Sequence, residues 1–359
     1  MRLPTLVPTD PRPRERGWRA GARHLAFALV SAAIVAVVSE RMFWFWASAP
    51  VSHVEVSIYY AMATAPVLWL IDRYRVDRWG PLVMVAMVFG LVVEGVLTPV
   101  TYTGGPFVPF FPVWFAAWHG LMALGGAWYL LHRWLLDGRV RAIATASVFA
   151  GAFWGLWSMT LTLPENVEDE ELIADHGGPL VVLEPMAFLR YAITFSLILG
   201  AAHWIWGRLG DVGRFRPARP TIAVYGLAVV AMLVGWSVAI PWAIPMFALY
   251  TWLAVWFLRR HAPTADRPSL LGQLSGPVRA RHLVGLLPLP AAAASTYALL
   301  WWLAPTDTTL RVVMYGTIVV QTIIASVWLW RSGREITRRH AQRSSAASAS
   351  KVPGVNSLS

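Results

Sequence analysis

Cysteine is absent from this chain of 359 residues, and only 14% of its residues are charged. The lack of cysteine excludes disulfides, thiolate metal sites and a cysteine nucleophile. Hydrophobic residues make up 57% of the chain. So small a polar fraction cannot cover the surface of a soluble protein of this length. The composition therefore indicates a membrane protein, most of whose surface faces lipid.

Two further absences exclude classes of function. The sequence contains neither a Walker A loop nor the glycine fingerprint of dinucleotide-binding proteins. An ATP-driven pump or a nicotinamide enzyme is therefore not expected, and we predict no cofactor. The net charge of +11 does not indicate a nucleic-acid partner, because the basic residues lie in short segments between apolar runs and not on one face of a folded domain.

Long apolar runs account for most of the chain, and about ten of them approach the ~20 residues needed to cross a bilayer. We therefore predict an all-α, polytopic integral membrane protein without a soluble domain. The first run is too long for a secretory signal and contains Glu40 and Arg41, so we interpret it as a retained helix. The predicted spans are 25–47, 56–71, 81–101, 112–131, 142–163, 180–205, 221–240, 242–258, 283–304 and 312–330.

The distribution of arginine predicts the orientation of these spans. Every second connector is basic, and the alternate ones contain no arginine. Basic connectors stay in the cytoplasm, so both termini are predicted to be cytoplasmic, in what we expect to be a bacterial plasma membrane. The predicted regions are a basic tail without regular structure (1–24), a six-helix region with the polar site (25–206), a basic loop (207–220), an apolar four-helix region (221–330), and a second tail without regular structure (331–359).

Glu94 and His119 form the centre of the predicted site. Ionisable groups inside a membrane are costly and mark functional sites by default. At a rise of about 1.5 Å per residue, Glu94 lies about 10 Å below the outer end of its helix, and His119 returns to nearly the same depth. We predict that Glu94 is the general acid or base and that His119 is the complementary proton carrier.

Four further residues complete the predicted site as substrate-binding groups. Glu40, on the first helix, lies in the same layer, and Arg190, on the sixth, lies slightly deeper. Arg190 is predicted to hold an anionic head group or to balance the charge of the carboxylate. Thr98 lies one helical turn from the glutamate, and Tyr102 follows in the connector.

The connector at 104–112 is rich in glycine and proline and cannot continue a helix. Non-helical backbone near the membrane surface is tolerated where it packs in protein or lines a water-filled cavity, so we predict a re-entrant lid over the site. No metal is predicted, because His119, Glu94 and Glu40 do not occur at short ligand spacing. The pair Gly151 and Gly155 matches the spacing of close helix packing.

Each of these signals has a structural alternative. Glu94 could only lock helices together through Arg190 or Arg41, and His119 could be a neutral residue bonded to a helix carbonyl. Glu40 and Arg41 could reach the membrane surface from the helix end. The acidic connector at 165–175 could bind a cation but is more often solvated.

Two other histidines, His132 and His203, lie near cytoplasmic ends of their spans and are interpreted as interfacial.

Three functional hypotheses remain open. The first is a membrane-embedded enzyme acting on a lipid-like or isoprenoid-like substrate from the extracytoplasmic side. The second is a proton-coupled transporter or a channel that uses the same residues. The third is a non-catalytic membrane subunit or assembly factor whose charges only hold helices together.

Overall fold

The computed structural model consists of helices. It describes residues 18–43, 50–97, 115–164, 183–210, 212, 214–217, 219–264 and 266–349, and every regular element in these ranges is helical. Eight of these helices are long and apolar enough to cross a membrane. The predicted all-α, multi-pass architecture is confirmed at this level, while its orientation stays a prediction.

The sequence predicts about ten spans, two more than these eight. The two extra spans correspond to η3 (Phe115–Leu131) and α12 (Ala243–Arg260), which are helical but are not among the eight. The described part of η3 is only 17 residues long, and α12 has 18 residues, the last two of which are arginines. Both are thus short of the length or hydropathy of the other spans.

The central helix of the bundle is α3 (Trp79–Val92), which continues into η2 (Val93–Leu97). Within this span 89% of the apolar window is buried, compared with 11% in the span Pro220–Ala239. Its sequence is apolar on every side, and a helix of that kind is stable only when other helices surround it. It packs against η3, α12, α2 (Pro50–Arg73) and α16 (Asp307–Ala349).

The remaining helices of the N-terminal half surround one side of α3. α1 (Trp18–Ala36) continues into η1 (Val37–Arg41) and lies against α2, η3 and α10 (Pro185–Arg208). A hydrogen bond of 3.0 Å from the indole of Trp128 on η3 to the hydroxyl of Ser31 fixes the register of α1 against η3. η3 itself runs on into the short helix α6 (His132–Asp137).

Close backbone contact joins α7 (Val140–Thr160) to α15 (Pro288–Leu303). A Cβ added to Gly151 would lie 2.3 Å from the carbonyl oxygen of Leu289, and one added to Gly155 would lie 2.2 Å from another α15 carbonyl oxygen. Only glycine fits at these two positions. The packing function predicted for this glycine pair is confirmed.

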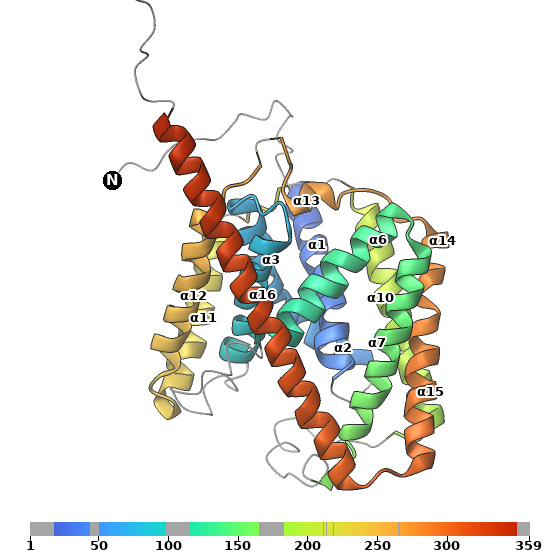
Figure 1. Ribbon diagram of the computed structural model, residues 1–359. Coiled ribbons are helices and arrows are strands. Elements are labelled where there is room, and N and C mark those ends of the chain that lie inside the picture. The colour runs from blue at the N-terminus through green and yellow to red at the C-terminus, as the bar shows by residue number, and fades with distance from the viewer. Residues whose placement is uncertain are drawn as a thin grey trace, which may run out of the picture.

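The last four spans pack against different parts of the bundle. α15 packs against α7 and α10, whereas α12 and α16 pack against α3, and α11 (Arg219–Ala239) packs against α12 and η2. Figure 1 shows α11 and α12 on one side of α3, and α7 with α15 on the other. Apolar helices present similar surfaces, so composition alone did not distinguish their neighbours.

The final helix, α16, has 43 residues and crosses the whole bundle (Figure 1). It differs from the tail without regular structure predicted from residue 331 onward, because it continues through Ala349. Glu335 explains part of the difference. Its carboxylate accepts hydrogen bonds from Arg78 at 2.9 Å and pairs with Arg339, one turn further along, at 3.1 Å. Both contacts favour a helical continuation.

Candidate functional site

Glu94 and His119 meet inside the bundle. Nε2 of His119 forms a hydrogen bond with Oε1 of Glu94. The side chain of His119 is 1% exposed and that of Glu94 is 17% exposed. The imidazole is therefore enclosed, while part of the Glu94 side chain stays accessible. The structure thus places the two residues together, and their chemical roles stay predictions.

The ionisable groups of this region lie on π-helical stretches. η1 contains Glu40 and Arg41, η2 contains Glu94, and η3 contains His119. A π-helical turn holds an extra residue, so it rotates the side chains that follow it about the helix axis. Such turns are rare in proteins as a whole, but those that occur are often found at functional sites. The local winding therefore changes which side chains of an otherwise apolar helix face the site.

Tyr60 on α2 connects this pair to a second carboxylate. Its hydroxyl donates to Oε1 of Glu40 at 2.6 Å and lies 3.5 Å from Nδ1 of His119. The ring packs against Phe89 of α3, with 6.0 Å between ring centres. Tyr60 is 3% exposed. Four helical segments thus contribute to one chain of polar groups running from Glu40 to Glu94.

One arrangement of protons satisfies the hydrogen bonds between Glu40, Tyr60, His119 and Glu94. A phenol has one proton, and the short bond directs it to Glu40, so the oxygen of Tyr60 accepts from Nδ1–H of His119. Nε2 of this tautomer then faces Oε1 of Glu94. Every link of the chain is therefore able to pass a proton.

Arg41 places a buried cation beside the chain. It is 1% exposed, and its guanidinium carbon lies 5.4 Å from the centre of the Phe195 ring on α10. Its backbone carbonyl accepts a hydrogen bond of 3.0 Å from the hydroxyl of Tyr191. The alternative that Arg41 reaches the membrane surface from its helix end does not fit this enclosure.

Arg190 is not part of the cluster. Its side chain is exposed on α10, and within the described residues no ion pair joins it to Glu94 or Glu40. The inward face of α10 is formed by residues such as Phe188 and Ala192, and Arg190 falls on the opposite side of the helical turn. The predicted contact between Arg190 and the carboxylate is thus absent from the described part of the chain, where Arg41 lies next to Glu40 on η1.

Several predicted parts of the site lie outside the described residues. They are Thr98, Tyr102, the predicted lid at 104–112 and the acidic connector at 165–175. Their roles stay predictions. Among the residues that the structure describes, no three histidine, aspartate or glutamate side chains are grouped as metal ligands.

Two histidines that the sequence assigns to the membrane interface are buried. His132 and His203 are each 0% exposed, and their Nδ1 atoms lie 3.0 Å apart. The ring of His132 stacks on Trp206 with 3.5 Å between ring centres. Both side chains are therefore enclosed by protein, while their depth in the membrane stays a prediction. Linear distance along a helix does not reveal that a neighbouring helix covers its end.

A second ionisable cluster lies at the other end of α3. Asp77 is 1% exposed and accepts hydrogen bonds from Arg78 at 2.9 Å and from the amide of Thr264 at 2.8 Å. Nε2 of His261 lies 3.4 Å from the same carboxylate. Burial, together with the Arg78 cation, lowers the pKa of His261, and these effects outweigh the opposing effect of Asp77.

Comparison with protein-family models, with curated proteins and with solved structures found no match to this chain. The function is therefore inferred from the geometry of the site and from the membrane setting of the helices that form it.

Proposed function

We propose that this protein is a membrane-embedded enzyme that performs acid–base chemistry on a lipid-like substrate. The observation that supports the proposal is the direct contact of Glu94 with His119 inside a helical bundle, where the Glu94 side chain is partly accessible. Glu94 exchanges a proton with the substrate, and His119 supplies or receives that proton behind it.

The chain of polar groups provides a route for the proton. When Glu94 passes its proton to Nε2 of His119, Nδ1 releases one to the oxygen of Tyr60, and the phenol proton moves to Glu40. One proton leaves Glu94 and one arrives at Glu40, so charge and atoms balance. Glu40 is thus the proton reservoir of the site.

The surroundings of Glu94 favour an apolar substrate. Its neighbours Val93 and Val96 are buried apolar residues, and the carbonyl of Val96 accepts a hydrogen bond from Trp236 of α11 at 2.9 Å. α11 itself exposes many apolar side chains, as expected of a helix that faces lipid. These apolar surroundings favour a substrate that is itself apolar and enters from the bilayer.

Comparing the lipids of cells that produce wild-type and variant protein tests this proposal. Mass spectrometry of lipid extracts is expected to show a species that is formed or consumed with wild-type protein and is unchanged with Glu94→Gln. The matched control is Glu184→Gln, which removes a carboxylate from an exposed position. An altered lipid that persists in the Glu94→Gln cells would contradict the catalytic assignment.

Proton-coupled transport is a second candidate, because the same chain has a carboxylate at each end. Proton relays of carboxylates and histidines occur in membrane pumps and transporters. In proteoliposomes this function predicts a proton flux that Glu94→Gln and Glu40→Gln both abolish. An enzyme without transport function gives no flux with either the wild type or the variants.

A further inference from the structure

A polar cavity of about 630 Å³ lies at the opposite end of the η3–α6 helix from His119. It forms between the turn after α6 and the linker from α13 (Leu270–Gln273) to α14 (Ala280–Leu283). This is the end of the bundle that is rich in arginine, which we predict to face the cytoplasm. The cavity is thus separate from the Glu94–His119 site.

Glycines shape the walls of this cavity. Gly138 ends α6 with φ of 70°, and Gly276 in the linker has φ of 152°, both in the left-handed region that glycine favours. A Cβ on Gly138 would lie 3.0 Å from the ring of His282, so its absence lets that ring close one wall. The ring is fixed by a 2.6 Å bond from Nδ1 to the carbonyl of Leu135.

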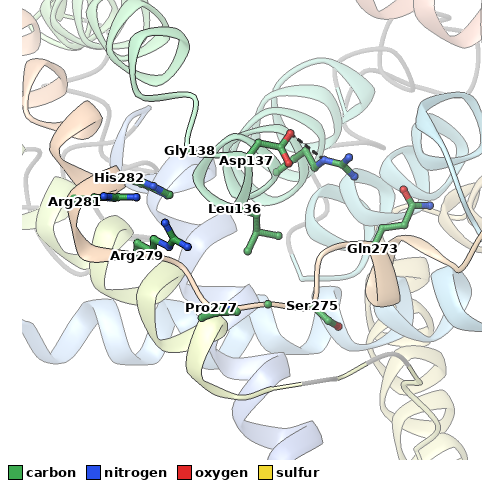
Figure 2. Close-up of a pocket in the computed structure, with 11 residues that line it drawn as sticks. Leu136, Asp137, Gly138, Gln273, Ser275, Pro277, Arg279, Arg281 and His282 are labelled. Atoms are coloured by element: carbon green, nitrogen blue, oxygen red, sulfur yellow. Dashed lines mark hydrogen bonds and ion pairs between the residues drawn. The ribbon is translucent and has the colours of Figure 1, made fainter.

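The cavity has an excess of positive charge. Asp137 is its one lining carboxylate among the described residues, and it already pairs with Arg133 at 3.3 Å and with Arg139 at 3.5 Å. Arg279 and Arg281 also line the cavity, and no described carboxylate pairs with either of them. Figure 2 shows these two arginines and His282 along one rim, with Asp137 across from them.

Exposed apolar side chains continue from the basic rim along the same helix. Val284 is 55% exposed and Leu287 is 65% exposed, three and six residues after Arg281. In a membrane, arginines at a helix end lie among lipid head groups, while apolar side chains one or two turns deeper contact the acyl chains. The basic rim therefore matches the anionic head group of a phospholipid, and the exposed apolar side chains match its acyl chains.

We propose that this cavity binds a phosphate group through Arg279 and Arg281. The fork of an arginine matches the oxygens of a phosphate, and basic pockets between helices on the cytoplasmic side hold anionic head groups. Val284 and Leu287 favour a phospholipid as the source of that phosphate. A free phosphorylated molecule presents the same group and is distinguished by experiment.

Binding of fluorescent phosphatidylglycerol to the purified full-length protein in detergent tests the proposal. The pair Arg279→Ala and Arg281→Ala is expected to weaken binding at least about tenfold, because both phosphate ligands are lost. The control pair, Arg259→Ala and Arg338→Ala, removes the same charge from exposed positions elsewhere at this end and is expected to change binding less than about twofold. Size-exclusion profiles confirm folding of both pairs.

The outcomes separate the sources of phosphate. Displacement of the probe by glycerol 3-phosphate indicates a soluble ligand, and retention of the probe indicates a lipid. Equal weakening in the control pair, or equally tight binding of a fluorescent diacylglycerol, which has the same acyl chains but no phosphate, would overturn the proposal. If the alanine pair does not fold, Arg279→Lys with Arg281→Lys keeps the charge but loses the fork, and unchanged affinity in this pair contradicts the assigned arginine geometry.

Discussion

Tyr60 links the carboxylate of Glu40 to His119, which in turn contacts the carboxylate of Glu94. Tyr60→Phe keeps the ring that packs on Phe89 and removes the hydroxyl between Glu40 and His119. We expect substrate turnover or proton flux to fall at least about tenfold, a typical contribution of a positioned proton-transfer group. The change in unfolding free energy should be only about 1 kcal/mol, the usual net effect of one hydrogen bond.

The neighbouring tyrosine supplies the control. Tyr59 is 58% exposed, so Tyr59→Phe makes the same chemical change outside the site. Equal loss of activity in both variants would show that the Tyr60 hydroxyl has no special part in proton transfer. Thermal unfolding of the two purified variants in detergent separates a lost function from a lost fold.

His261 makes stability depend on pH. Its pKa in the folded protein is lowered from the ordinary value of 6.5, chiefly by burial and then by Arg78, against the opposing effect of Asp77. Arg343 also lowers it, and Glu335 faces the cluster through its bond to Arg78. The folded state therefore prefers the neutral imidazole. The contribution of the neutral His261 to stability is therefore fully present above about pH 6.5 and is lost as the pH falls towards the lowered pKa.

We therefore expect the unfolding temperature of the wild type to drop between about pH 7 and about pH 5. His261→Gln, which cannot gain a proton, should show a smaller drop over the same interval. Thermal unfolding of both proteins in detergent measures the difference. Identical pH dependence would mean that the His261 imidazole does not contribute to this sensitivity.

The sequence predicted part of the site, and its failures share a physical cause. Depth along a helix follows from residue counting, and it correctly brought Glu94 and His119 to the same level. The direction of a side chain around the helix axis depends on packing and on π-helical winding, which no residue count reveals. That is why Arg190 was expected in the site, whereas Tyr60 was not.

At the scale of helices, the glycine contact between α7 and α15 is the most sensitive to substitution. Gly155→Ala places a Cβ 2.2 Å from an α15 carbonyl oxygen, so the two helices must separate. We expect a loss of about 1–3 kcal/mol in unfolding free energy, the usual effect of overpacking. Thermal unfolding of the purified protein checks the prediction.

Gly235→Ala is the matched control on α11. Nothing lies within 4 Å of a Cβ at this position, and alanine favours the helix more than glycine does. Stability is expected to stay the same or to rise slightly. A Gly155→Ala variant as stable as Gly235→Ala would contradict the close packing of α7 and α15.

The existence of the helices could be predicted from sequence more readily than their partners. Apolar runs gave helices close to the predicted ranges, because only a helix satisfies the backbone inside lipid. Which helices pack together depends on surface details. The close contact at Gly151 could be predicted from its spacing to the next glycine. The partners of uniformly apolar helices could not, because their surfaces look alike in the sequence. The ion pairs of Glu335 extend α16 across a segment whose composition alone suggested no regular structure.

For the whole molecule, α16 offers a test of the predicted orientation. Thr308 and Arg338 are exposed near opposite ends of this helix, about 45 Å apart at 1.5 Å per residue. Because the chain contains no cysteine, Thr308→Cys and Arg338→Cys each introduce one reactive thiol. A membrane-impermeant maleimide should label Thr308→Cys in intact cells and Arg338→Cys only after permeabilisation. Labelling in the reverse order would invert the predicted topology.

The account as a whole depends on Glu40 and Glu94 belonging to one proton-sharing chain through His119 and Tyr60. Infrared difference spectra of the purified protein between about pH 5 and about pH 8 report the protonation of its carboxyl groups directly. The account predicts that Glu94→Gln removes one carboxyl band and shifts the band assigned by Glu40→Gln, while Glu184→Gln shifts neither. A Glu40 band that is unchanged by loss of Glu94 would contradict it.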